Sequence, residues 1–462
     1  MFLVLSTWSC NRDCMRERIL LFTILAGLWT FIYVFQYHVD TVKGLIILLC
    51  FMALYGVYNS LAIWHNKRKQ KKNPVEPDSS YYPFISIMIP AHNEESVIAK
   101  TVENIQNLAY KKFEIILIDD RSTDNTYSVI KDLCEKYNNV LSLRREEGAF
   151  PGKSAVLNDA LPLAGGEAIL VFDADATVEP DFLSKLVPNL APSDVGAVQA
   201  RKVIRNAETN ILTKCQNNEY TLDTYLQVGR DAIKGAVELR GNGELIKREA
   251  LEDIGGWNNY TITDDLDMAT RLHIKGWDVR YCLDAVVYEE GVKYLVPLFR
   301  QRRRWLEGTI RRYLEYFFEA IFSKKMSLRA KLDMVVYITQ FIMPLWFLFE
   351  LLIRGFKLLT HKPGVGIQNE LMSSVIISFA VAFGFFFAIR YSLRRYDFMK
   401  RWEAIKQASY TALYMLIIWF PMVLYICGKI LFLKKDMRWG KTTHGLIMEE
   451  EDLHTTAEVE KC

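Results

Sequence analysis

The sequence lacks three features that would mark common classes of protein. Its eight cysteines show no C-x-x-C spacing, so a zinc site is not expected. It has no glycine-rich loop of the type that cradles phosphates with backbone amides. It also lacks an excess of one charge: 57 lysines and arginines stand against 54 aspartates and glutamates, a net charge of +3. That balance excludes a disordered chain and one that binds nucleic acid through bulk charge.

What the sequence does have is a strong segregation of apolar residues. Mean hydropathy over the 462 residues is +0.05, an average that hides two populations. The apolar runs lie at residues 19–37, 44–64, 334–353, 371–389 and 408–433. Each is long enough to cross a bilayer core, which takes about 20 helical residues. One such run could be a buried core helix, but five of them at the two ends of the chain predict a membrane protein with a soluble domain in between.

Basic residues predict the orientation. Arg16 and Arg18 precede the first run, and a basic cluster at 67–72 follows the second, which places the soluble domain in the cytoplasm. The chain is thus expected to be an integral multi-pass membrane protein. The first run is taken as a retained anchor, because no small-x-small cleavage site follows it. Basic residues after the last run also indicate a cytoplasmic location, whereas five full crossings would place the tail on the other side. Either that run is broken at Pro421 and re-enters, or the positive-inside rule fails there.

The soluble part has the pattern of an α/β domain. Short apolar runs at 84–89, 113–118 and 168–172 predict strands, and helical periodicity at 96–108 and through residue 136 separates them. Strands that alternate with helices predict a parallel sheet. Ligands of such sheets bind beyond the carboxyl ends of the strands.

Acidic residues follow two of these strands. Asp119 and Asp120 follow the second, and Asp173 and Asp175 follow the third. In Asp173-x-Asp175 the two carboxylates lie on one side of an extended segment, because side chains alternate with period two. Oxygen ligands of this kind suit Mg²⁺ shared with substrate phosphates. Most isolated D-x-D motifs are surface turns, but the strongly apolar strand before this one favours a metal-bound nucleotide.

Two later motifs suggest the second substrate. Asp264, Asp265 and Asp267 open a helical stretch; one or two carboxylates would suffice as caps, so a general base that deprotonates an acceptor hydroxyl is expected among them. The other motif is the basic cluster 301–305. It is either a juxtamembrane site for anionic lipid or a diphosphate clamp with an aromatic platform. Residues 309–330 behind it are expected to form an interfacial amphipathic helix with Arg311 and Arg312 on its polar face.

In this order and context, the motifs resemble those of the membrane-bound family 2 glycosyltransferases, which include cellulose, chitin, hyaluronan and poly-N-acetylglucosamine synthases. The resemblance covers residues 84–325 and implies a GT-A fold, a UDP-sugar donor, Mg²⁺ (or Mn²⁺ in its place) and inversion at the anomeric carbon. It implies these roles: Glu94 and Asp119 at the uridine with Asp120 adjacent, Lys153 near the nucleotide, Asp173 and Asp175 at donor and metal, Asp265 as base beside Asp264, and Gln301, Arg304 and Trp305 at the acceptor end.

A narrower resemblance is to the cyanobacterial β-monoglucosyldiacylglycerol synthases. The segments that carry it are 238–243, 255–258, 262–267, 332–334, 342–344 and 441–444. It implies transfer of glucose from UDP-glucose to the free hydroxyl of diacylglycerol at the bilayer. The alternatives are a processive polysaccharide synthase of the poly-N-acetylglucosamine, cellulose or hyaluronan type, and a non-catalytic membrane scaffold.

The expected organisation has five parts. They are a cytoplasmic N-terminus with two transmembrane helices (1–72), a cytoplasmic GT-A domain (73–308), the interfacial helix (309–330), about three transmembrane helices (331–433) and a polar tail (434–462). The expected partners are a UDP-sugar, diacylglycerol or another membrane acceptor, and the lipid bilayer, with no nucleic acid.

Overall fold

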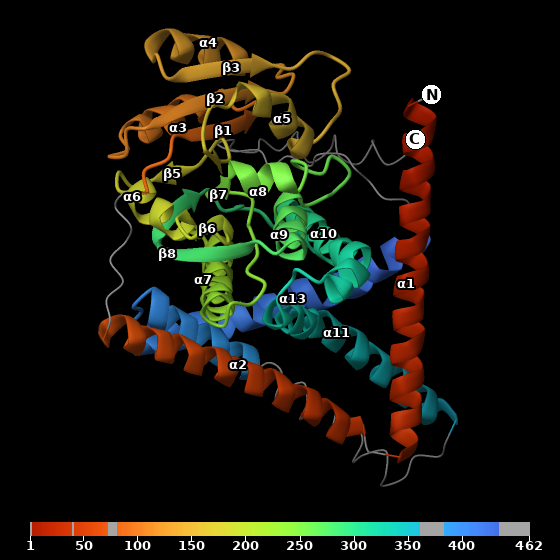
Figure 1. Cartoon of the computed structure of the whole chain (residues 1–462). Helices are drawn as coiled ribbons and strands as arrows, with labels where there is room; N and C mark the ends of the chain where they lie inside the picture. Colours follow the sequence, from red (N-terminus) through yellow and green to blue (C-terminus); the bar gives the residue numbers. More distant parts are fainter. Residues whose placement is uncertain (1, 39–40, 73–80, 361–382, 434–462) are drawn as a thin grey trace.

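The computed structural model describes residues 2–38, 41–72, 81–360 and 383–433 (Figure 1). An α/β domain occupies the middle of the chain, and long helices from both ends lie along one side of it. The helices are α1 (Phe2–His38), α2 (Thr41–Lys72), α3 (Ile98–Gln106), α4 (Thr126–Lys136), α5 (Lys153–Ala160), α6 (Phe182–Leu186), α7 (Ile211–Ala232), α8 (Arg248–Asp253), α9 (Asp264–Lys275), α10 (Leu295–Phe322), α11 (Leu328–Thr360) and α13 (Arg401–Phe432).

Eight strands form one sheet in the order β3-β2-β1-β4-β7-β6-β8-β5. They are β1 (Ile85–Ala91), β2 (Phe113–Asp119), β3 (Val140–Arg144), β4 (Ala168–Val171), β5 (Thr177–Val178), β6 (Val195–Ile204), β7 (Glu244–Lys247) and β8 (Asp278–Glu289). The prediction of a parallel sheet is correct for β1 to β4. It is incomplete beyond them, because β7 runs antiparallel to both β4 and β6, and β5 runs antiparallel to β8.

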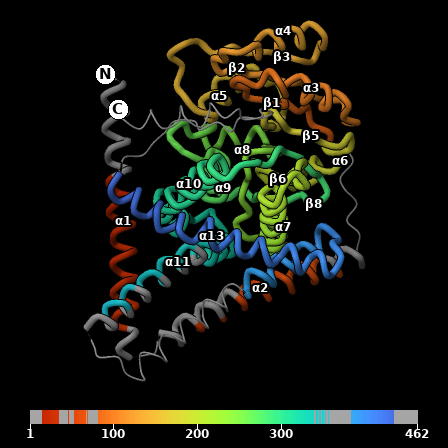
Figure 2. Tube along the Cα trace, turned by 180° about the vertical axis from the view of Figure 1, so that it is seen from behind, coloured from red at the N-terminus to blue at the C-terminus, as the bar shows by residue number. Residues whose placement is uncertain are grey.

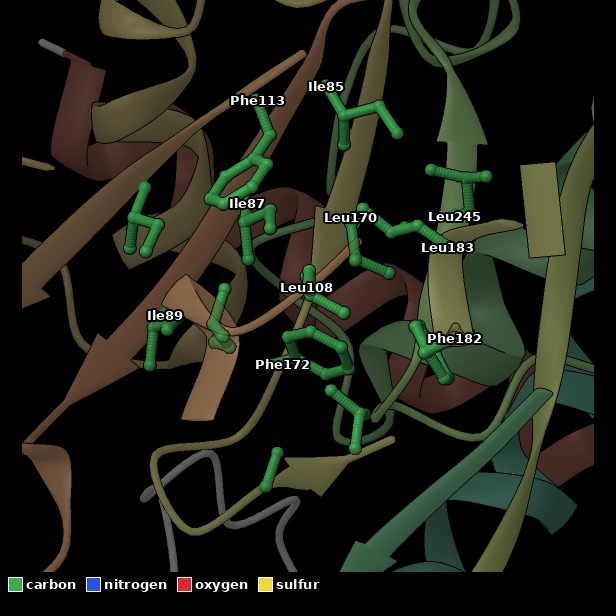
Figure 3. Close-up of a cluster of buried hydrophobic side chains, with 14 of the residues drawn as sticks. Ile85, Ile87, Ile89, Leu108, Phe113, Leu170, Phe172, Phe182, Leu183 and Leu245 are labelled. Carbon is green, nitrogen blue, oxygen red and sulfur yellow. The ribbon is translucent and has the colours of Figure 1, made fainter. Parts of the chain in front are cut away.

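The strands form because their apolar side chains are buried on both faces of the sheet. Ile87 and Leu170 pack with Phe113 on one face, whereas Met88 and Val171 belong to the cluster on the other. Figure 3 shows the first face, with Ile87, Phe113 and Leu170 among the side chains that gather there. Burial on both faces explains the near-continuous apolar runs that identify these strands in the sequence.

The terminal helices pack together and against the α/β domain. α1 contacts α10, α11 and α13, and α2 and α13 contact α7 (Figures 1 and 2). In the described part of the chain, two segments are long and apolar enough to cross a membrane, Met15–Val34 and Arg401–Phe432. The expected run at 371–389 falls largely outside the described residues. Pro421 lies inside α13, which continues unbroken to Phe432, so the idea of a helix broken there is wrong.

One expectation about residues 309–330 is also wrong. Arg311 and Arg312 do not lie on an outer polar face, since both are buried within α10. Arg311 pairs with Glu307 and with Glu17 of α1, and Arg312 Nη2 lies 2.8 Å from Glu238 Oε1. The helical periodicity of the sequence predicts that these polar side chains are exposed. It carries no information about the carboxylates from other segments of the chain that pair with them in the interior.

Candidate active site

A cavity of about 780 Å³ lies beyond the carboxyl ends of β1 and β4 and reaches the terminal helices. Of the residues predicted from the sequence to form the site, Asp119 alone is not on its wall. The predicted residues that line it are Glu94, Asp120, Lys153, Asp173, Asp175, Asp264, Asp265, Gln301, Arg304 and Trp305. Residues that are more than 200 positions apart in the chain thus meet at one site, as expected for the switch point of an open α/β sheet.

The nucleotide end of the cavity is formed by residues that follow β1 and β2. Asp119 is fully buried, and its Oδ1 accepts a hydrogen bond from the backbone N–H of Ser122 at 3.3 Å. Asp120 reaches the cavity, and its Oδ1 lies 2.7 Å from Nη1 of buried Arg145. Of this pair, Asp120 faces the cavity, and Asp119 holds the turn behind it.

Lys153 and Asp173 form an ion pair on the cavity wall. Nζ of Lys153, in the first turn of α5, donates to Asp173 Oδ1 at 2.6 Å and to the carbonyl of Gly241 at 2.8 Å. Burial alone would lower the pKa of Lys153, but the carboxylates of Asp173 and Asp264 outweigh it and hold that pKa above its usual value. The lysine is a fixed cation where a diphosphate can bind.

Asp173 and Asp175 are suited to a divalent cation. Both line the cavity; the side chain of Asp173 is 43% exposed, and Asp175 Oδ2 accepts the backbone N–H of Glu290 at 3.0 Å. Within the described residues, no group of three or more histidine, cysteine or acidic side chains could enclose a metal by itself. Two hard oxygen ligands fit a cation that takes the rest of its ligands from phosphate and water.

Asp265, the residue expected to act as general base, lies on the cavity wall. It lies in the first turn of α9, where its Oδ1 accepts the N–H of Leu266 at 2.8 Å. Burial and the neighbouring Asp264 carboxylate raise the pKa of Asp265 to about 6, so it is ionised at neutral pH yet basic enough to take a proton. Gly241, at φ +77°, lets the backbone approach it: a Cβ there would lie 3.2 Å from Asp265 Oδ2.

Helix α10 presents the acceptor-end residues from one face. Gln301, Arg304 and Trp305 are spaced i, i+3 and i+4, so they project on the same side and line the cavity. Arg302 is not among the residues that line the cavity: it is fully buried, its Nη2 lies 3.0 Å from Oε2 of Glu219 on α7, and its guanidinium carbon lies 4.2 Å from the centre of the Trp305 ring. The basic cluster thus divides between the cavity and the protein interior, which is not the pattern of a simple lipid-binding patch.

Other residues of the site carry no motif in the sequence. Lys202 on β6 lines the cavity, and its Nζ lies 3.0 Å from Glu289 Oε2 and 5.7 Å from the centre of the Trp305 ring. The hydroxyl of Tyr220 on α7 donates a hydrogen bond to Glu289 Oε1. The sequences around Lys202 and Tyr220 contain no motif that indicates a functional site. Their place on the cavity wall is known only from the structure.

Glu244 lies behind the site, at the start of β7. It is fully buried, and in the described part of the chain neither carboxyl oxygen has a hydrogen-bond partner. Burial, followed by the negative charge of Asp264, raises the pKa of Glu244 well above its usual range. Its surroundings therefore favour the protonated form of Glu244 more than water would.

The far end of the cavity is apolar. Phe341 and Pro344 of α11 line it, together with Met415, Trp419 and Val423 of α13. Among the described side chains of these two helices, none that lies on its wall is charged. The cavity therefore joins a polar pocket to an arm enclosed by apolar helices.

Comparison with known proteins agrees with this geometry. The model of a family described as "Glycosyltransferase like family 2" matches residues 83–308. A β-monoglucosyldiacylglycerol synthase from Nostoc sp. is 40% identical over 366 residues, which are 78% of this chain and 76% of that protein. The Synechocystis enzyme of the same name is 35% identical, over 80% and 76%. Poly-β-1,6-N-acetyl-D-glucosamine synthase from Staphylococcus aureus is more distant, at 28% identity over 66% and 73%.

A solved structure supports the fold. A mannosyltransferase from Pyrobaculum calidifontis, in complex with GDP-mannose and Mn²⁺, aligns with 81% of this chain and 98% of its own at a TM-score of 0.55 and 23% identity. The GT-A fold expected from the sequence is thus confirmed, and the chain belongs to glycosyltransferase family 2 as a nucleotide-sugar-dependent enzyme related to the β-monoglucosyldiacylglycerol synthases.

Proposed function

We propose that this protein transfers glucose from UDP-glucose to the free hydroxyl of 1,2-diacylglycerol, with inversion, to give β-monoglucosyldiacylglycerol. The observation that carries the proposal is the single cavity that joins the Lys153–Asp173 pair to an arm lined by apolar residues of α11 and α13. A water-soluble donor needs a polar, charged end of the cavity, and an apolar acceptor needs an end lined by apolar side chains. The relatives named as β-monoglucosyldiacylglycerol synthases, which match most of the chain, support the choice of substrates.

The proposed reaction is a direct displacement. Asp265 accepts the proton of the acceptor hydroxyl as its oxygen attacks C1 of glucose, and UDP leaves on the opposite face. Lys153 offsets the charge that develops on the diphosphate, and Arg304 lies where it can bind the same group. Trp305 provides a flat apolar surface beside the base, on which the sugar ring can lie. No covalent intermediate is required.

Asp173 and Asp175 are the residues that would hold a divalent cation. Bound there, Mg²⁺, or Mn²⁺ in its place, would supply charge neutralisation of the UDP leaving group. Glu94 and Asp120 would contact the nucleoside from the ends of β1 and β2.

We further propose a multi-pass membrane protein whose catalytic domain, residues 73–308, faces the cytoplasm. The two apolar segments Met15–Val34 and Arg401–Phe432 support membrane insertion, and the basic residues that flank the N-terminal runs support the orientation. In this arrangement residues 309–330 lie at the membrane surface, and 331–433 return to the bilayer. The hydroxyl of diacylglycerol, which lies at the interface, then enters beside Trp305.

The test is an incubation of the purified full-length protein in detergent with labelled UDP-glucose, diacylglycerol and Mg²⁺. The proposal predicts a labelled product that migrates as a monoglucosyl lipid in thin-layer chromatography, and its loss in Asp265→Asn. A panel with UDP-galactose and UDP-N-acetylglucosamine checks the donor. Label that remains at the origin as polymer would support the polysaccharide synthase, and an unchanged Asp265→Asn protein would support the scaffold.

A further inference from the structure

A second lysine, Lys202 of β6, lies on the cavity wall in addition to Lys153. Successive side chains of a strand point to opposite faces, and here Ala200 and Lys202 line the cavity. Arg201 between them does not, and it pairs with Asp397 outside the cavity wall. The strand therefore presents one cation to the site of transfer and uses the next one to fix the domain to the segment before α13.

The ammonium group of Lys202 is surrounded by residues that line the cavity. Its Nζ lies 3.0 Å from Glu289 Oε2 and donates to the backbone carbonyl of Arg240 at 3.2 Å. The centre of the Tyr220 ring is 5.0 Å away and that of the Trp305 ring 5.7 Å away. All four of these neighbours line the cavity. Among the described residues the two oxygens are the acceptors of Nζ, so one of its three N–H groups is left for a ligand.

Glu289, the partner of Lys202, is itself held in place. Its Oε1 accepts a hydrogen bond from the hydroxyl of Tyr220, and its Oε2 accepts one from Asn242 Nδ2 at 3.3 Å. The other side-chain atom of Asn242, Oδ1, accepts the backbone N–H of Asp173 at 3.2 Å. The Lys202–Glu289 pair thus has a set position relative to the residue expected at the donor.

The charges around Lys202 place it between donor and base. Burial alone would lower the pKa of Lys202. The carboxylate of Glu289, followed by those of Asp173 and Asp265, outweighs burial and holds that pKa above its usual value. In a direct displacement, C1 of the sugar lies between the leaving diphosphate and the hydroxyl that the base activates. A cation that interacts with carboxylates on both sides is therefore close to the transferred sugar.

The Lys202–Glu289 pair suits a neutral ligand. Glu289 is buried and accepts from three donors, so its negative charge remains beside Lys202 when a substrate binds. A phosphate next to this pair would meet a carboxylate as well as the ammonium group. A sugar hydroxyl carries no charge, and its oxygen can accept the remaining N–H of the lysine.

We propose that Lys202 Nζ donates a hydrogen bond to one hydroxyl of the transferred glucose, so that this residue contributes to the choice of donor sugar. The inference rests on the proposed transfer from UDP-glucose and adds a sugar-binding residue that lies outside every motif of the sequence. Lys202 touches the substrate, but it takes no proton from the acceptor and holds no metal.

The test compares UDP-glucose with its 2-deoxy, 3-deoxy, 4-deoxy and 6-deoxy analogues as donors to diacylglycerol. In the full-length wild-type enzyme, loss of the hydroxyl that Lys202 binds should lower kcat/KM by about 10-fold or more, the value of a hydrogen bond from a charged donor. Lys202→Met keeps the length of the side chain but has no N–H. Its kcat/KM for UDP-glucose should fall by about the same factor, with little further loss for that one analogue.

The ratio of kcat/KM for UDP-glucose to kcat/KM for each analogue is the informative quantity, because the intrinsic reactivity of each donor cancels when the two enzymes are compared. One ratio should collapse in Lys202→Met, and the other three should keep their wild-type values. The Kd of UDP, measured by calorimetry, should not change, since UDP carries no glucose.

Lys247 of β7 provides the matched control. Its Nζ also donates to a backbone carbonyl, that of Pro192 at 3.1 Å, and lies 6.0 Å from the centre of the Trp277 ring. It is not among the described residues that line the cavity. Lys247→Met should therefore keep all four ratios and the wild-type kcat/KM for UDP-glucose.

Four unchanged ratios in Lys202→Met would overturn the inference, and weaker binding of UDP together with them would assign this lysine to the diphosphate. If Lys202→Met does not fold, the wild-type enzyme still decides: a loss below about 3-fold with every analogue would mean that no charged side chain binds a sugar hydroxyl. No transfer from UDP-glucose itself would overturn the proposed function as well.

Discussion

A Cβ atom on Gly308 would lie 2.3 Å from Cγ2 of Thr263, far inside van der Waals contact. Gly308 thus lets α10 rest directly on the residue that precedes Asp264 and Asp265. This close approach brings Trp305, one turn earlier on α10, to the same cavity as the base. One glycine therefore positions Trp305 on the cavity wall that Asp265 shares.

Gly308→Ala is predicted to disrupt this arrangement. The added methyl group must push α10 away from α9, which costs about 1–3 kcal/mol of folding stability and lowers kcat/KM by roughly 10-fold or more through misplacement of Trp305. Gly428→Ala is the control, because a Cβ there meets nothing within 4 Å. Thermal unfolding and steady-state kinetics measure both effects. A Gly308→Ala enzyme with wild-type activity would refute this role.

The ionisation of Asp265 should set the acid limb of the pH–rate profile. Below about pH 6 the carboxyl is protonated and cannot accept a proton, so kcat should rise as the pH increases through its pKa of about 6. Asp265→Asn should lower kcat by about 10²- to 10⁴-fold. Asp264→Asn removes the like charge that raises this pKa, so the remaining activity should have its acid limb at lower pH. An acid limb that stays in place would argue against Asp265 as the base.

The three consecutive arginines of α10 are predicted to differ in effect. Arg302→Ala removes the guanidinium partner of Glu219, whose carboxylate keeps the hydrogen bond from the Tyr414 hydroxyl, and should cost about 1–3 kcal/mol, visible as a fall in Tm. Arg304→Ala should lose activity at an unchanged Tm, because Arg304 lines the cavity. Arg303 is not the partner of Glu219 and is not among the described residues that line the cavity, so Arg303→Ala is the control. Equal effects of all three on vesicle binding, with Tm and kcat unchanged, would instead indicate a lipid-binding basic patch.

Metal dependence should change at Asp175. Removal of divalent cations by EDTA is expected to abolish transfer, and Asp175→Asn should raise the Mg²⁺ concentration for half-maximal activity by about 10-fold, the value of roughly 1.4 kcal/mol of lost binding. Asp181 offers a matched control, since its surface carboxylate pairs with Lys185 and is 54% exposed. Mn²⁺ binding followed by electron paramagnetic resonance checks the same residue without activity. Unaltered metal affinity in Asp175→Asn would remove it from the site.

The sequence is sufficient to predict the parallel half of the fold and many of the acidic and basic residues that line the cavity. The runs before Asp119 and Asp173 are buried on both faces, so their apolar pattern is nearly continuous, and the acidic pairs that follow stand out against it. The i, i+3, i+4 spacing from Gln301 likewise predicts one face of a helix. These signals are local, because each depends only on neighbouring residues.

The remaining features depend on contacts between distant segments. Glu219 joins Tyr414, 195 residues away, and Arg302 at one carboxylate, and neither neighbouring sequence indicates this. The same holds for Arg311, whose partner Glu17 lies in the first helix of the chain. Asp119 and Asp120 cannot be distinguished by pattern, because only the turn after β2 decides which carboxylate faces the cavity. The apolar arm needs two helices far apart in sequence to be placed side by side.

The most direct test of the central claim is the proton NMR spectrum of the lipid formed by purified protein from UDP-glucose and diacylglycerol. The account predicts one glucose per lipid and the large H1–H2 coupling of a β-anomer. An α-linked glucose, a polymer, or no glucosylated lipid at all would contradict it.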